Sequence, residues 1–284
     1  MLKIENLKVT FDNFQLNCSL SIQPGQITGI IGSNGAGKTT LFNSILGLLP
    51  NIEGNILLFN KNIQNITSHD KEKIGVILSD STFSGYLNIN DIEKILKNMY
   101  SHFDSIFFSE KINQYNLPKK QAIKNFSTGM IARLKFIIAL SHNAQFLILD
   151  EPTSGLDILA RNDLLDLLRD YMTLHENCSI LISSHISNDL ETLCDDIYLI
   201  NQGSILLHED TDLILSQYAL LKVTIEQFVT LDKTYLLKYQ KEPFGYTCLT
   251  SQKQFYQENY PSIVIENATI DTLLPLMIKG ENLS

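Results

Sequence analysis

The sequence predicts an α/β fold built around a mostly parallel β-sheet. Three short apolar runs, at residues 27–31, 146–149 and 179–183, are typical of strands buried on both faces of such a sheet. A glycine-rich loop and a helical pattern follow the first run, and an amphipathic, leucine-rich helix is expected over 157–172. Strands that alternate with helices in this way favour parallel pairing.

The other elements follow from the same signals. Before the first buried run, strands are expected at 2–11 and 14–22, separated by a turn at Asp12-Asn13. A helix is expected from about residue 38 to 49, where Pro50 ends it. The remaining predictions are strands at 55–59 and 74–78, mainly helix over 91–140, and a hairpin with arms 197–200 and 205–208.

Length and composition indicate one large domain with a small addition. The chain has 284 residues, of which 44% are hydrophobic, and this suffices for a sizeable core. From about residue 216, tyrosine and glutamine become common. We therefore expect a main domain over 1–215 and a small C-terminal α/β accessory domain over 216–284.

Charge and cysteine usage argue against some classes of function. A net charge of −9 disfavours binding to nucleic acid, which needs lysine and arginine for the phosphates. The four cysteines, Cys18, Cys178, Cys194 and Cys248, form no CxxC pair, which favours reduced thiols in the cytoplasm over a metal site. We find no secretory signal and no run of ~18 apolar residues. Any membrane step is therefore expected to need another chain.

Residues 32–39 carry the strongest chemical signal, because their sequence fits the phosphate-loop pattern G-x-x-x-x-G-K-[ST]. Glycines let the amides of the loop turn toward phosphate, and the following helix adds the positive end of its dipole. Lys38 would reach the β- and γ-phosphates, and Thr39 would bind Mg²⁺. An accidental glycine-rich loop is the alternative, which the flanking strand and helix disfavour. The candidate ATP-binding residues here are Ser33, Asn34, Gly35, Ala36, Gly37, Lys38, Thr39 and Thr40.

Two further motifs add acids and a capped helix. The strand at 146–149 ends in Asp150, which could hold Mg²⁺, and Glu151, which is placed to polarise the attacking water. The alternative for both is a pair of solvated acids at a strand end. In the segment 126–130, Ser127 is a good N-cap for the next helix, and this is the better interpretation of Ser127 taken alone.

Taken together and in this order, the motifs resemble the nucleotide-binding domain of ATP-binding-cassette (ABC) transporters over about residues 1–215. GSNGAGKTT is similar to the Walker A motif, FLILDE to Walker B, and FSTGM stands where the LSGGQ signature stands. Ser154, Gly155 and Asp157 match the D-loop, His185 matches the switch histidine, and Phe11 stands where an aromatic ring stacks on adenine. The resemblance implies a P-loop NTPase with a RecA-like core, an antiparallel β-subdomain and a helical subdomain inserted at about 81–142.

The resemblance also implies how the residues divide their work. Glu151 and His185 would be catalytic, and Thr39 and Asp150 would hold the metal in one chain. Ser127, Thr128 and Gly129 would bind the ATP of a facing chain, so that two cassettes, identical or different, close over ATP and Mg²⁺. Alternatives are a non-catalytic cassette, a soluble ATPase in an assembly or regulatory role, and an ATPase that acts on nucleic acid or ribosomes.

Within the family, the chain resembles the exporter branch of bacitracin-resistance, Ytr-type and phenol-soluble-modulin ATPases. Met130 at the end of the signature and the closing segment TIDTLLPLMIKGE carry this likeness. It implies a separate integral membrane permease of the ABC-2 type and export of peptides or amphipathic, antimicrobial compounds. The chain would then sit in the cytoplasm, peripheral on the inner face of the membrane.

The segment after residues 74–78 departs from the family, where a glutamine that touches Mg²⁺ and water is expected. Ser79 and Asp80 stand there instead. Our hypothesis is that Asp80, a hard oxygen donor, replaces the glutamine as a metal ligand. The alternative is that Asp80 faces solvent and caps the following helical region.

Overall fold

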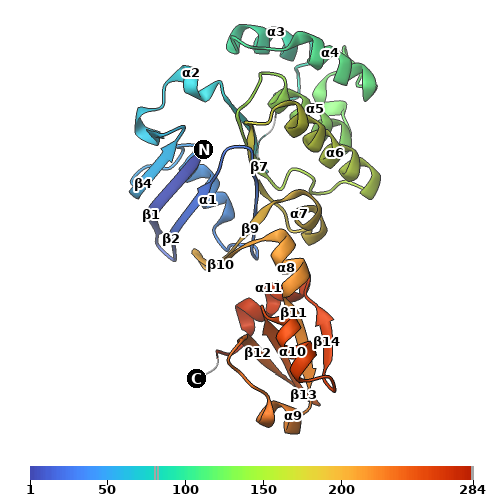
Figure 1. Ribbon diagram of the computed structural model, residues 1–284. Coiled ribbons are helices and arrows are strands. Elements are labelled where there is room, and N and C mark those ends of the chain that lie inside the picture. Colours follow the sequence, from blue (N-terminus) through green and yellow to red (C-terminus); the bar gives the residue numbers. More distant parts are fainter. Residues whose placement is uncertain (80, 82, 283–284) are drawn as a thin grey trace.

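A computed structural model describes residues 1–79, 81 and 83–282, which form three β-sheets with helices packed against them (Figure 1). The first sheet is antiparallel, in the order β2-β1-β4-β5. Its strands are β1 (Leu2–Phe11), β2 (Phe14–Ile22), β4 (Glu53–Leu58) and β5 (Lys61–Asn62). Their buried apolar side chains share one core with α1 (Lys38–Ile45), which confirms the expected antiparallel subdomain.

The second sheet has six strands, in the order β10-β9-β3-β8-β7-β6. All its pairings are parallel except that of β10 with β9, so the predicted mostly parallel sheet is confirmed. Every residue of β3, β7 and β8 is buried, as their apolar runs predicted. The strands are β3 (Ile27–Ile31), β6 (Ile74–Ile77), β7 (Phe146–Asp150), β8 (Ser179–Ser183), β9 (Asp196–Asn201) and β10 (Ser204–Asp210).

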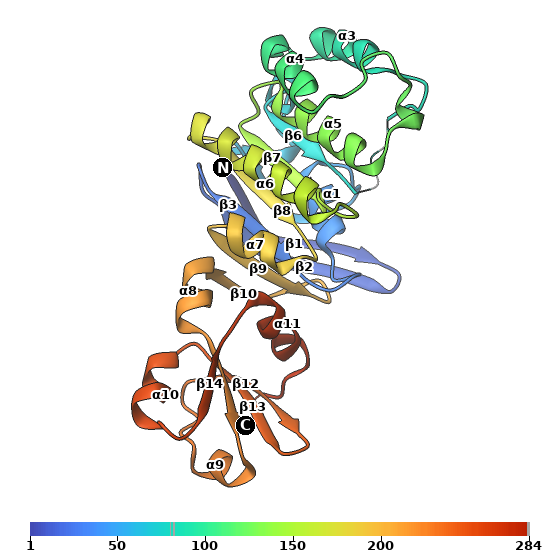
Figure 2. The same cartoon turned by 90° about the vertical axis from the view of Figure 1, so that its right-hand side faces the viewer.

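The segment between β6 and β7 is mainly helical. It holds α3 (Ile89–Met99), α4 (Ser105–Gln114) and α5 (Thr128–Leu140), which share a core of their own, and Figure 2 shows them together at one end of the molecule. Asn88 and Asp91 form a capping box that fixes the start of α3. Outside this segment, the chain up to β11 also contains α2 (Ser68–Lys71), α6 (Ile158–Leu174), α7 (Ser187–Leu193), α8 (Thr211–Gln217) and a 3₁₀ turn at Ile63–Asn65. A second 3₁₀ turn, Ile123–Asn125, lies just before α5.

One expected helix is shorter than the sequence suggested. The pattern predicted a helix to residue 49, but α1 ends at Ile45. Gly47 follows with a φ of 67°, the left-handed conformation that ends helices, and Leu48 is exposed. The prediction was wrong because it took Pro50 as the stop signal and overlooked the glycine before it.

The C-terminal part forms a third sheet, wholly antiparallel, in the order β12-β13-β11-β14. Its elements are β11 (Ala219–Val223), α9 (Ile225–Thr230), β12 (Leu236–Glu242), β13 (Gly245–Thr250), α10 (Lys253–Asn259), β14 (Val264–Asn267) and α11 (Ile270–Lys279). Figure 2 places α11 at the end of this part that faces the six-stranded sheet. The expected boundary at residue 216 falls inside α8, and the division at that residue stays a prediction.

Two whole-chain expectations concern cysteines and membranes. All four cysteines are buried and carry free thiols, and burial raises the pKa of Cys18, Cys178 and Cys248 to about 12. Such thiols stay protonated at neutral pH and are poor nucleophiles. Over the residues the structure describes, no helix has the length and apolar character needed to cross a membrane.

Candidate functional site

The predicted site residues lie where several parallel strands end at the same edge of the six-stranded sheet. The glycine-rich loop follows β3, Asp150 ends β7, and Ser183 ends β8. Because β3, β8, β7 and β6 are parallel neighbours, their carboxyl ends meet at this edge. Ligands of open α/β sheets bind there, since the loops after the strands converge.

The loop before α1 forms a hollow of about 610 Å³. Of the nine residues predicted to bind ATP, the eight at 33–40 line it, and Phe11 does not. Gly37 has a φ of 114°, and a β-carbon there would come within 3.0 Å of the Phe14 ring, so the position requires glycine. The hollow opens at the N-terminus of α1, where unpaired amides and the helix dipole favour an anion.

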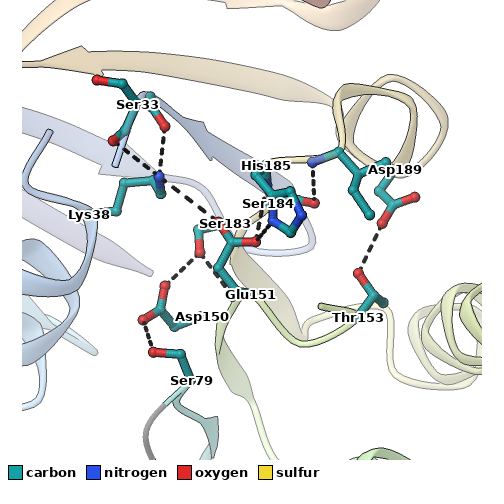
Figure 3. A network of polar contacts seen from close by, with 12 residues as sticks. Ser33, Lys38, Ser79, Asp150, Glu151, Thr153, Ser183, Ser184, His185 and Asp189 are labelled. Carbon is teal, nitrogen blue, oxygen red and sulfur yellow. Dashed lines mark hydrogen bonds and ion pairs between the residues drawn. The ribbon is translucent and has the colours of Figure 1, made fainter. Parts of the chain in front are cut away.

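Lys38 is buried, and its ammonium group lies within the hollow. Its Nζ donates to the backbone oxygen of Gly32 at 2.7 Å and lies 3.9 Å from Glu151 Oε1 (Figure 3). Its Nζ also donates to the backbone oxygen of Ser33 at 3.4 Å. A buried cation held by two carbonyl oxygens and a carboxylate 3.9 Å away is well suited to pair with phosphate oxygens.

Asp150 is buried among three hydroxyl groups. Thr39 and Ser79 each donate to its Oδ2 at 3.1 Å, and Ser183 donates to its Oδ1 at 2.7 Å. Carboxylate and hydroxyl oxygens are the ligands that Mg²⁺ prefers, so the donors present fit this ion. No cluster of three histidine, cysteine or acidic side chains suited to a metal occurs among the described residues.

Glu151 has an unusual backbone conformation, with a φ of 49°. Non-glycine residues seldom adopt it, and such strain persists where neighbouring contacts enforce it. Here the Glu151 amide donates to Ser183 Oγ at 3.0 Å. The Glu151 side chain accepts from the His185 amide at 3.0 Å, and its Oε2 lies 2.5 Å from His185 Nδ1. The carboxylate is therefore held beside Lys38 and the hollow (Figure 3).

A second set of contacts anchors the turn after Glu151. Thr153 donates to Asp189 Oδ2 at 2.9 Å, and Arg161 Nε lies 3.1 Å from Asp189 Oδ1. Burial raises the pKa of the Asp189 carboxyl, while the Thr153 hydrogen bond and the Arg161 charge act in the opposite direction. Sequence reasoning missed Asp189, because a single acid in a helix gives no signal before its partners are known.

The signature residues lie apart from the phosphate loop. Ser127 caps α5 and accepts from the Met130 amide at 3.3 Å, as the capping prediction required, and its side chain is exposed. A β-carbon at Gly129 would meet nothing within 4 Å. Ser127 and Gly129 are not among the described residues that line the loop hollow. This surface is therefore free to approach another molecule.

A second hollow, of about 540 Å³, joins the two regions. Thr128 and Ser154 line it together with Asn34, Glu151 and His185. In the D-loop, Gly155 has a φ of 74°, and Asp157 caps α6 by accepting from the Ala160 amide at 2.9 Å. Ser154 thus lies between the carboxyl edge of the sheet and the surface that carries Thr128.

Phe14 and Ser79 were not among the predicted binding residues but line the loop hollow, whereas the predicted Phe11 does not. Phe14, not Phe11, lines the loop hollow, and the two rings lie 6.3 Å apart across the turn between β1 and β2. Phe11 is 48% exposed. Ser79 contacts Asp150 although a serine is short, because β6 delivers it to the same edge. Asp80 lies outside the described residues.

Comparisons with known proteins agree with this geometry. Residues 16–154 match the family model described as ABC transporter. The lantibiotic transport ATP-binding protein SrtF of Streptococcus pyogenes is 33% identical over 216 residues, 75% of this chain and 92% of that protein. The ABC transporter ATP-binding protein YtrB of Bacillus subtilis is 29% identical over 235 residues, 81% of this chain and 79% of that protein.

The fold is also that of a solved cassette. A dimeric ATP-binding cassette in a post-hydrolysis state, bound to ADP and Pi, aligns with a TM-score of 0.64 and 21% identity. The alignment covers 74% of this chain and 99% of that cassette. Fold, phosphate loop and sequence similarity lead to one conclusion: this chain belongs to the ABC transporter family, among its ATP-binding ATPase chains.

Proposed function

We propose that this chain is the ATP-hydrolysing subunit of an exporter and works as a pair of cassettes that closes over ATP. The observation that carries the proposal is a division in the site. Lys38, Asp150 and Glu151 surround one hollow, whereas Ser127 is exposed and Gly129 half-buried outside it. One chain therefore offers half of a phosphate site and, on another surface, the complement of a second half.

In the first half, Lys38 neutralises the β- and γ-phosphates, and the amides of 33–40 hold their oxygens. Thr39 and Asp150 hold Mg²⁺, which lowers the charge repulsion at the phosphates when it is bound. Glu151 orients the attacking water and accepts its proton, and His185 keeps that carboxylate in place through Nδ1. The triphosphate is the substrate, with Mg²⁺ as cofactor.

In the second half, the signature of the facing chain completes the site. Ser127, Thr128 and Gly129 lie at the N-terminus of α5, whose amides favour the γ-phosphate. Of the D-loop residues Ser154, Gly155 and Asp157, Ser154 lines the hollow that also holds Thr128 and Glu151, and Asp157 caps α6. The facing chain is a second copy or a related cassette, since either would carry the same motif.

The membrane partner and the cargo follow from the family. SrtF is named for lantibiotic transport and YtrB for ABC transport, which supports an integral permease, of ABC-2 type, as the partner. We propose that the chain works in the cytoplasm on the inner face of the membrane, and that peptides or amphipathic antimicrobial compounds are exported. A net charge of −9 gives no support to a nucleic-acid partner.

The variant Glu151→Gln tests the paired mechanism. We expect steady-state hydrolysis to fall by ~10²–10⁴-fold, because the general base is lost, while ATP binding survives. The variant should elute as a dimer from gel filtration in ATP and Mg²⁺, and as a monomer without them. A dimer no more populated than that of the wild type would contradict closure over ATP. Co-purification of a permease from detergent-solubilised membranes, or its absence, separates an exporter from a soluble assembly ATPase.

A further inference from the structure

Helix α7 begins two residues after His185 and presents different side chains on opposite sides. Ser187 and Glu191 are four residues apart and lie on one side of the helix. Asp189 is two residues from each, or about 200° around the helix, and faces the opposite way. One short helix therefore has two separate sets of contacts.

The first set joins α7 to the C-terminal part of the chain. Ser187 Oγ donates to Asp271 Oδ1 at 2.5 Å, and the Ile270 amide donates to Glu191 Oε1 at 2.7 Å. The Glu191 carboxylate thus lies at the N-terminus of α11, where the helix dipole favours negative charge. Leu190 and Leu193 of α7 belong to the same buried apolar cluster as Ile270 and Leu273 of α11.

The second set joins α7 to the catalytic edge. Asp189 accepts from Thr153 and pairs with Arg161, and Thr153 is two residues after Glu151 (Figure 3). His185, just before α7, lies against the Glu151 carboxylate. The position of α7 therefore decides where the imidazole lies relative to Glu151.

We infer that the C-terminal part of the chain supports catalysis from a distance: Asp271 and Glu191 are positioning residues that fix α7 and thereby hold His185 against Glu151. The inference rests on the proposed function, in which His185 and Glu151 serve hydrolysis. The described contacts of α11 reach α7 but not residues 33–40. Loss of the support should therefore lower turnover and leave nucleotide binding unchanged.

Asp271→Ala removes the acceptor of the Ser187 hydroxyl. We expect kcat for ATP to fall by about threefold to tenfold, since a hydrogen bond to a charged group contributes less at this partly exposed site than it would when fully buried. KM for ATP should stay within about twofold, because only the position of His185 changes. Asp271→Asn retains an acceptor oxygen and should restore most of the turnover.

Glu226→Ala is the matched control, because Glu226 is also an exposed acid in the first turn of a C-terminal helix. Among the described residues, its carboxylate is hydrogen-bonded only within that turn. This variant should behave as wild type. Ser187→Ala removes the donor of the same hydrogen bond. It replaces Asp271→Ala in the experiment if that variant folds poorly. A wild-type kcat in both Asp271→Ala and Ser187→Ala would overturn the inference. So would a loss of kcat as large in Asp271→Asn as in Asp271→Ala.

A second measurement does not depend on hydrolysis. In nucleotide-free protein with labelled histidine, the imidazole resonance of His185 can be assigned by its absence in His185→Gln. We expect Asp271→Ala to shift this resonance more than those of the other five histidines, and Glu226→Ala to leave it in place. An unmoved His185 resonance overturns the inference even in an active enzyme. A wild-type chain without ATPase activity would refute the proposed function instead.

Discussion

We propose that the carboxyl edge of the six-stranded sheet and the exposed start of α5 both bind phosphate, but their surroundings differ. At the edge, the ends of β3 and β7 bring loop amides, Lys38, Asp150 and Glu151 around one hollow. At the start of α5, a capped helix end with Ser127 and Gly129 is left open. The first region lies within one chain and forms one half of the proposed site, whereas we propose that the second acts on the ATP of a facing chain. Residues that gather around a hollow indicate a site within the chain, and a capped helix end left open indicates a site shared with another molecule.

Lys38→Ala should give the largest effect in this comparison. It removes the buried ammonium group from the hollow, and with it charge-assisted hydrogen bonds to phosphate of about 3 kcal/mol in total. We expect ATP affinity to fall on the order of 100-fold or more. Equilibrium binding of a fluorescent ATP analogue measures it, with Lys94→Ala, at an exposed lysine of α3, as the control. Affinity within threefold of wild type would remove Lys38 from the phosphate site.

Ser127→Arg tests the other region. The long side chain would meet the facing phosphate, so we expect hydrolysis and ATP-dependent dimerisation to be lost. ATP binding to the monomer should match wild type, because Ser127 is exposed and outside the loop hollow. The same binding assay and gel filtration in the Glu151→Gln background measure both properties. If Ser127→Arg weakens monomer binding as much as Lys38→Ala, the two motifs do not serve opposite halves.

Ser79→Ala sharpens the account of the catalytic edge. It removes one of the two hydroxyls that donate to Asp150 Oδ2, and we expect a threefold to tenfold shift in the Mg²⁺ concentration for half-maximal activity, or about 1 kcal/mol. Asp80→Ala, assayed in the same titration, compares the neighbouring acid. A raised Mg²⁺ requirement in Asp80→Ala alone would support the Asp80 hypothesis and leave Ser79 with a structural role.

Phe14→Ala and Phe11→Ala should give the smallest effects. Together they test which of the two rings stacks on adenine. Phe14 lines the loop hollow and Phe11 does not. If adenine stacks on Phe14, its loss should weaken ATP binding by about 1 kcal/mol, or fivefold, while Phe11→Ala changes little. Competition between ATP and GTP reports on the base contact directly. The reverse order of effects would restore the stacking role that the sequence assigned to Phe11.

Sequence patterns predicted the elements well where they depended on local signals. The runs at β3, β7 and β8 are apolar throughout because both faces of a parallel sheet are covered, and this pattern is visible without coordinates. Ser127 as a helix cap was likewise a local inference. The end of α1 was misplaced, since Gly47 and Pro50 are competing stop signals and sequence alone does not rank them.

The sequence by itself determined that a phosphate loop, two acids and a histidine occur in this chain, because glycine spacing and buried strands have local physical causes. The tertiary structure decided which residues meet. Ser79 reaches Asp150, Phe14 lines the hollow in place of Phe11, and Ser187 meets Asp271 eighty-four residues away. These contacts depend on strand order and helix packing, which bring distant segments together and leave no periodic trace in the chain.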